Sequence, residues 1–141
     1  MAARDHSMQE TSLAGVTPAA TRKQIATSFL RDVATGRVRE AFLAHVAADF
    51  RHHNAYFRGD AKSLMTAMEE NARQNPQKAL DVHHALEDGD LVAVHSHVRH
   101  SPDDPGAALV HLFRFQGNRI VELWDIAQMI TADSPNENGI F

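Results

Sequence analysis

The chain has 141 residues, of which 43% are hydrophobic and 23% charged, and this is enough for one domain with a single core. Its formal net charge is −4 and no cluster of Lys and Arg occurs, so neither nucleic acid nor an anionic membrane is expected as a partner. It contains no cysteine, which excludes disulfides, thiolate catalysis and cysteine-based zinc sites. No apolar run approaches the roughly 20 residues of a membrane span, and the polar start is unlike a secretory signal, so we expect a cytoplasmic protein.

The first predicted elements are an N-terminal arm and a helix. Residues 1–16 are predicted to form a flexible arm, and residues 17–141 a single domain. Thr17 and Pro18 suit the N-cap and first position of a helix that ends at Gly36, because proline lacks only a donor that would be unpaired there. The apolar residues of this helix recur at helical spacing: Ile25, Phe29, Leu30 and Val33.

Two more helices and then a run of strands follow. Helices are predicted at about 37–47 and 60–71, with an extended segment at 50–57 between them. In the second half of the chain the apolar residues no longer recur at helical spacing, and the segments read as strands. Turn-forming Gly, Pro, Asp and Asn residues separate these strands. Helices followed by an antiparallel meander predict an α+β fold rather than a βαβ sheet. The predicted strands are 80–86, 91–100, 107–115 and 119–129.

Histidines are the unusual feature of the composition. There are ten of them, and eight lie between His52 and His111. Alternate residues of a strand share a face, so His95 and His97 are expected to point the same way. If the following loop closes symmetrically about Asp103, His95 lies directly opposite His111 on the next strand.

The face presented by the last strand depends on the length of the preceding turn. A two-residue turn at Gly117–Asn118 would bring Trp124 to the face of His111, whereas a three-residue turn at 116–118 would bring Asp125 there. We favour the three-residue turn, because Asn tolerates the positive φ that the bulge would require. In that register the opposite pairs are His111–Leu123 and Leu109–Asp125.

A structural explanation stands beside the functional one. A single histidine on a strand is usually half-exposed or satisfied by its neighbours, and Asp125 could simply pair with Arg99 or Arg114. Several imidazoles on one face among Val, Leu and Phe are harder to explain in this way, because burying an unpaired polar ring costs about 1–3 kcal/mol. Such a cluster predicts a pocket.

Several segments together resemble a known family. In order they are HHN at 52–54, VHSHV at 94–98, VHLFRF at 110–115, RIVELWDIAQ at 119–128 and NENGIF at 136–141. Over about residues 20–141 they resemble the SnoaL-like proteins of the nuclear transport factor 2-like superfamily, in particular a bacterial branch described as predicted aldol-condensation-catalysing enzymes. The resemblance implies a cone-shaped, curved antiparallel or mixed sheet with three helices that enclose a cavity, usually as a homodimer.

The resemblance also implies roles for individual residues. His53 and Asn54 match the His-Asn motif of the branch, and Trp124 and Asp125 match its Trp-Asp. In the polyketide cyclases of the superfamily a late-strand aspartate is the acid/base, which implies that role for Asp125. The sequence departs from the branch at Ala55, where Pro often follows, and at Leu123, where His often stands.

Related ketosteroid isomerases provide a further comparison. They carry an Asp base near the position of Asn54 and tend to have an acid at that of His111. Because neither residue matches here, steroid isomerisation is not predicted.

The predicted chemistry is acid/base catalysis without a cofactor. Asp125 would take an α-proton, and His111 would act as its partner at the developing oxyanion, with His95 and His97 as further donors. No Gly-rich phosphate loop and no lysine in a pocket-like setting suggests a cofactor. The sequence thus predicts an enzyme for enolisation, aldol-type condensation or cyclisation, or isomerisation of a small carbonyl compound. The other candidate substrate-binding residues are His53, Asn54 and Trp124.

Two other function classes remain open at this point. One is a domain that binds a small apolar ligand without catalysis. The other is a metal-dependent enzyme that uses a zinc or iron site made of His95, His97, His111 and Asp125.

A homodimer is expected from the alternation of the strands. A curved sheet has two faces, and apolar residues on its outer face would need a second copy of the chain to cover them. The residues expected there are Val94, Val98, Val110, Leu112 and Ile120.

Overall fold

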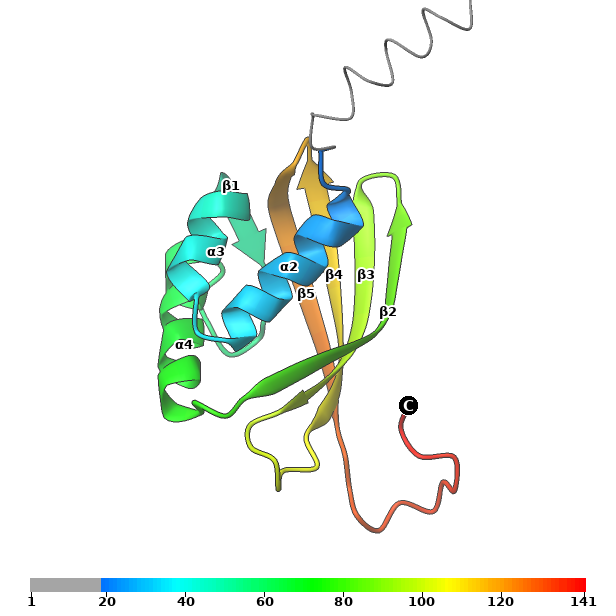
Figure 1. Ribbon diagram of the computed structural model, residues 1–141. Coiled ribbons are helices and arrows are strands. Elements are labelled where there is room, and N and C mark those ends of the chain that lie inside the picture. Colours follow the sequence, from blue (N-terminus) through cyan, green and yellow to red (C-terminus); the bar gives the residue numbers. More distant parts are fainter. Residues whose placement is uncertain (1–18) are drawn as a thin grey trace, which may run out of the picture.

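The computed structural model describes residues 19–141, so the predicted arm and the predicted N-cap at Thr17 lie outside this part. The described residues form an α+β domain in which three helices cover one face of a bent sheet (Figure 1). The strand order is β1-β5-β4-β3-β2, with β1 parallel to β5 and all other neighbours antiparallel. The elements are α2 (Arg22–Ala34), α3 (Val38–His45), β1 (Val46–His52), α4 (Ala61–Gln74), β2 (Ala79–Asp88), β3 (Leu91–Arg99), β4 (Ala107–Gln116) and β5 (Arg119–Met129).

Side-chain caps determine where two of the helices begin. Thr21 Oγ1 accepts a hydrogen bond from the Gln24 amide at 3.1 Å, and Gln24 Oε1 accepts one from the Thr21 amide at 2.8 Å. This reciprocal pair is a capping box, and it starts α2 at Arg22. Asp60 caps α4 by accepting a hydrogen bond from the Ser63 amide at 3.0 Å.

The core lies between α2 and the concave face of the sheet. The Phe29 ring contacts Phe113 of β4 edge-on, with centroids 6.0 Å apart, and Phe42 of α3 at 5.4 Å. Ile25 and Val33, on the same stripe of α2, are also buried. The apolar stripe of α2 therefore packs across the concave face.

The register of β3 against β4 differs by one residue from the predicted one. Val94, and not His95, lies opposite His111, because the pairing resumes with Val98 opposite Ala107. The loop between the strands is thus not symmetric about Asp103. A shift of one residue moves every side chain to the other face, so His95 lies on the outer face.

The β4–β5 hairpin also differs from the prediction. The turn has two residues, Gly117 and Asn118, and the positive φ of 59° belongs to the glycine. A β-bulge follows, in which Val121 is an extra residue without a partner in β4. The bulge brings Asp125 directly opposite His111, so the predicted pairs His111–Leu123 and Leu109–Asp125 are both wrong.

These registers change the predicted outer face of the sheet. Val94 and Ile120 are fully buried, and Val98 lines the inner face, so these three were assigned to the wrong side. Val110 and Leu112 do lie outside, opposite His95 and Trp124 respectively. No helix within residues 19–141 is long and apolar enough to cross a membrane.

Candidate functional site

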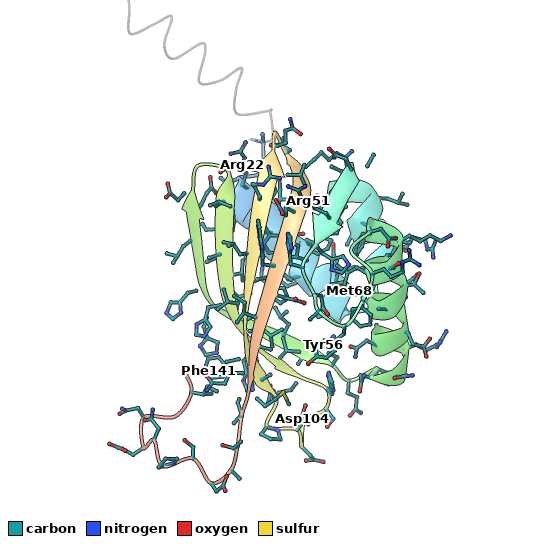
Figure 2. All side chains as sticks on the ribbon, turned by 180° about the vertical axis from the view of Figure 1, so that it is seen from behind. Arg22, Arg51, Tyr56, Met68, Asp104 and Phe141 are labelled. Atoms are coloured by element: carbon teal, nitrogen blue, oxygen red, sulfur yellow. The ribbon has the colours of Figure 1, made fainter. Side chains whose placement is uncertain are left out.

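A cavity of about 190 Å³ lies between α2, α4 and the concave face of the sheet. Most of its wall is apolar, and the apolar residues come from both helices, from three strands and, with Phe57, from the loop after β1. Met68, labelled in Figure 2, contributes to it from α4. The polar side chains of the wall are Asn54, Asn71, Lys78, His111 and Asp125.

His111 and Asp125 face each other across β4 and β5 at this cavity. Asn54, which lies just after β1, donates from Nδ2 to Asp125 Oδ2 at 2.8 Å. The Tyr56 amide donates to Asn54 Oδ1 at 2.9 Å, so both ends of the Asn54 amide are held. Among the described residues, Asp125 Oδ1 has no hydrogen-bond donor, which leaves one carboxylate oxygen for a ligand.

His111 is a buried, neutral imidazole. Burial lowers its pKa to about 4, and the nearby Asp125 charge, which raises the pKa, only partly opposes this shift. Lys78 adds a smaller lowering effect. The effect of burial on this pKa thus outweighs that of the carboxylate. His111 Nδ1 has no hydrogen-bond partner within residues 19–141, and Ser96 Oγ is buried and unpaired in the same way.

His52, to which the sequence analysis assigned no role, holds the segment that carries Asn54. It is buried on the same face as Phe50. Its Nε2 donates to the Arg58 carbonyl, and its Nδ1 accepts from the Asn54 amide at 3.1 Å. These bonds define its tautomer and position Asn54 beside Asp125. The sequence could have indicated this position, because alternate residues of a strand share a face and His52 is two residues after Phe50.

Two of the predicted substrate-binding residues, His53 and Trp124, lie outside the cavity. Their rings stack at 4.9 Å with an interplanar angle of 8°. His53 Nε2 donates to Glu122 at 2.6 Å, and Arg114 and Arg51 donate to the same carboxylate. These donors lower the pKa of Glu122 to about 2, and the hydrogen bond from His53 has the largest effect. Of the matched motifs, Asn54 and Asp125 face the cavity and their neighbours do not.

His95 and His97 are also displaced from the predicted pocket. His95 Nδ1 lies 3.1 Å from His84 Nδ1, and His97 Nε2 donates to the Pro105 carbonyl at 2.7 Å. The ring of Phe141 lies 5.4 Å from that of His95 and 4.8 Å from that of His97, where the C-terminal tail returns to the sheet (Figure 2).

The proposed metal ligands are therefore split between the two faces of the sheet. His95 and His97 lie on one face, and His111 and Asp125 on the other. In the part of the chain that the structure describes, no three His, Asp or Glu side chains are arranged to hold a metal ion. The metal-dependent alternative loses its site.

Lys78 is a cavity residue that the sequence analysis excluded. It is half-buried, and its Nζ donates to Asn71 Oδ1 at 2.6 Å. Burial lowers its pKa. The signal that could have found it is alternation, because Lys78 shares the parity of Leu80, which lies on the cavity wall.

Comparisons with known proteins agree with this architecture. The model of the SnoaL-like domain family matches residues 26–123. An NTF2-like protein of unknown function from Cytophaga hutchinsonii has a similar structure, with a TM-score of 0.65, 16% identity, and coverage of 80% of this chain and 95% of that one. No curated protein matches the chain.

Two further solved structures carry provisional functional descriptions. A protein from Acidithiobacillus ferrooxidans, provisionally described as a polyketide cyclase, has a TM-score of 0.60 and 19% identity, with coverage of 79% of this chain and 92% of that one. A protein from Agrobacterium tumefaciens, provisionally described as an isomerase of the SnoaL-like family, has a TM-score of 0.64 and 14% identity, with coverage of 77% and 99%. At these identities the likeness shows the fold alone. Since the family model matches well over half of the chain, the protein belongs to the SnoaL-like domain family, and its fold is NTF2-like.

Proposed function

We propose that the protein is a cofactor-independent acid/base enzyme for a small carbonyl compound. The observation that carries the proposal is the direct opposition of Asp125 and a neutral His111 in an apolar-walled cavity. One Asp125 oxygen is held by Asn54 and the other has no donor among the described residues. His111 Nδ1 likewise has no hydrogen-bond partner within residues 19–141.

The proposed step is enolisation. Asp125 takes the α-proton of the substrate, the C–H electron pair becomes the new C=C bond, and the carbonyl π pair moves to oxygen as an enolate. The N–H of neutral His111 donates to that oxygen. Return of the proton at another carbon gives isomerisation, and attack of the enolate carbon on a second carbonyl gives an aldol-type condensation or cyclisation.

The cavity volume favours a small substrate. Pockets for drug-sized ligands usually measure about 300–1,000 Å³. At about 190 Å³ this cavity is smaller, and its wall is largely apolar. Compounds of a few carbons with one or two carbonyl groups suit these dimensions better than a multi-ring polyketide.

Deuterium exchange tests the proposal without knowledge of the natural substrate. The full chain is incubated in D₂O with small ketones such as 2-pentanone, and loss of the α-proton signal is followed by NMR. We expect the exchange rate to exceed the background and to fall by about 10²-fold or more in Asp125→Asn, because that change removes the base and keeps the shape. Asp133→Asn, an exposed carboxylate in the tail, is the matched control and should exchange like the wild type. Exchange that is equal in Asp125→Asn and the wild type would remove Asp125 from the mechanism.

The second candidate is binding without catalysis, and the apolar wall of the cavity favours it. NMR spectra of the same samples distinguish the two functions. A pure binding domain would shift its cavity resonances on addition of the ketone and would show no exchange above background in any variant.

A further inference from the structure

Lys78 is a charged residue in the cavity wall that has no charged partner within residues 19–141. Its Nζ has one hydrogen-bond acceptor, the neutral amide oxygen of Asn71 at 2.6 Å. Within residues 19–141 no Asp or Glu oxygen lies within 4.0 Å of it. An ammonium has three N–H donors, so two of them are unused in the described part of the chain.

The backbone around Lys78 holds the side chain at this place. Asn75 ends α4 by donating its amide to the Asn71 carbonyl, and the Lys78 amide donates to the Asn75 carbonyl at 3.1 Å. Lys78 thus stands at a defined turn between α4 and β2. Its side chain joins a wall that includes Leu80, Val98 and Leu109.

An amine in such surroundings favours a negatively charged ligand. Moving a cation away from water is costly unless an anion compensates it, and burial accordingly lowers the pKa of Lys78. The charge also reaches the candidate reaction centre, because Lys78 contributes to the lowered pKa of His111. Among the described residues no arginine lines the cavity, so a singly charged carboxylate matches the site better than a phosphate does.

We infer that Lys78 binds a carboxylate of the ligand, so that the substrate is a small carbonyl compound that also carries a carboxylate group. The inference rests on the proposed function, since it specifies the substrate class of the same cavity. In this arrangement Lys78 anchors one end of the molecule, and His111 and Asp125 meet the carbonyl and its α-carbon. Lys78 is the specificity-determining residue.

A matched pair of probes tests the charge directly. The probes are 4-oxopentanoate and its neutral analogue 4-oxopentanamide, titrated into the full-length chain and followed by ¹H–¹⁵N NMR. In the wild type we expect the carboxylate to bind at least about tenfold more tightly than the amide. Lys78→Met, which keeps the length of the side chain and removes the charge, should lose this preference. Lys62→Met, an exposed lysine of α4, should keep it.

Further variants separate the anchor from other roles. Lys78→Arg keeps the charge and should retain the preference for the carboxylate even if the absolute affinity changes. If Lys78 only connects α4 to β2, Lys78→Met should weaken the binding of both probes equally. Equal losses of affinity would overturn the inference. A lysine that attacks the carbonyl carbon would form an imine with loss of water, and borohydride would then leave a permanent mass increase at Lys78. That adduct would also overturn it.

The outcome is independent of the exchange experiment. The binding preference is read without turnover, so it can fail while Asp125-dependent exchange is observed, and it can hold while exchange is absent. In the first case only the role of Lys78 is wrong. In the second case only the proposed catalysis is wrong.

Discussion

The imidazole of His111 experiences two opposing influences, and their balance links the cavity to the stability of the protein. Burial lowers its pKa to about 4 from an ordinary value of 6.5, although the Asp125 charge acts in the other direction. At pH values between these two pKa values, the unfolded chain binds more protons than the folded one. The free energy of unfolding therefore decreases as the pH falls through this window. The two pKa values give a loss of about 2 kcal/mol between pH 7 and pH 5.

Urea denaturation at pH 7 and at pH 5 measures this loss in the free energy of unfolding. In His111→Gln we expect the decrease between pH 7 and pH 5 to be smaller by about 2 kcal/mol than in the wild type. Only the difference between the two pH values is compared, so a constant destabilisation by the new side chain cancels. Glu122 does not interfere, because its pKa is lowered from 4.5 to about 2 and its stabilisation is lost only below that range. The same pH dependence in both proteins would contradict a buried neutral imidazole.

The placement of His111 and Asp125 on one cavity was predicted from the sequence, although for a wrong reason. A three-residue turn and a two-residue turn followed by a bulge both insert one extra residue, so both bring Asp125 to the same face of β5. The composition of the Gly117–Asn118 segment suits either turn, and nothing local marks Val121 as the bulge. The face of β5 on which Asp125 lies could therefore be predicted, but the residue that pairs with His111 could not.

At the scale of whole elements, Gly106 governs how β4 begins. Its φ is +82°, and a Cβ added there would lie 2.2 Å from the carbonyl oxygen of Val98, a backbone atom that cannot move aside. We expect Gly106→Ala to lower the free energy of unfolding by at least about 2 kcal/mol, as measured by urea denaturation. Gly117→Ala is the matched control, since it shares a positive φ of 59° but meets nothing within 4 Å, and should cost about 1 kcal/mol. Equal losses would mean that the contact with Val98 is unimportant.

This loop also explains why the histidines of β3 were misplaced. The helices and strands follow from periodicity and caps, and the predicted β5 agrees with Arg119–Met129. The loop between Val98 and Ala107 has no such period, and its centre depends on the close approach of Gly106 to the opposite strand. An error of one residue there was enough to move His95 and His97 from the cavity to the outer face.

At the scale of the whole molecule, the outer face of the sheet carries apolar surface that supports the proposed homodimer. Ile126 of β5 is 64% exposed and lies opposite Val110. We expect a dimer at micromolar concentration by light scattering, and Ile126→Asp should convert it to a monomer by placing a charge in the interface. Leu43→Asp is the control, because Leu43 is 75% exposed on α3 and should leave the dimer intact. A monomeric wild type would contradict the proposal.

The bulge at Val121 has a consequence for how such a domain can change over generations. Gain of a single codon between Asn118 and Leu123, with the bulge retained, would shift the rest of β5 by one residue along β4 and turn its side chains to the opposite face. Trp124 would then take the place of Asp125 beside His111, and an indole would replace a carboxylate without any substitution in the cavity wall. Proteins of this fold can therefore exchange one cavity lining for another through chain length alone, and an insertion in this hairpin can alter the chemistry as deeply as a substitution at the site.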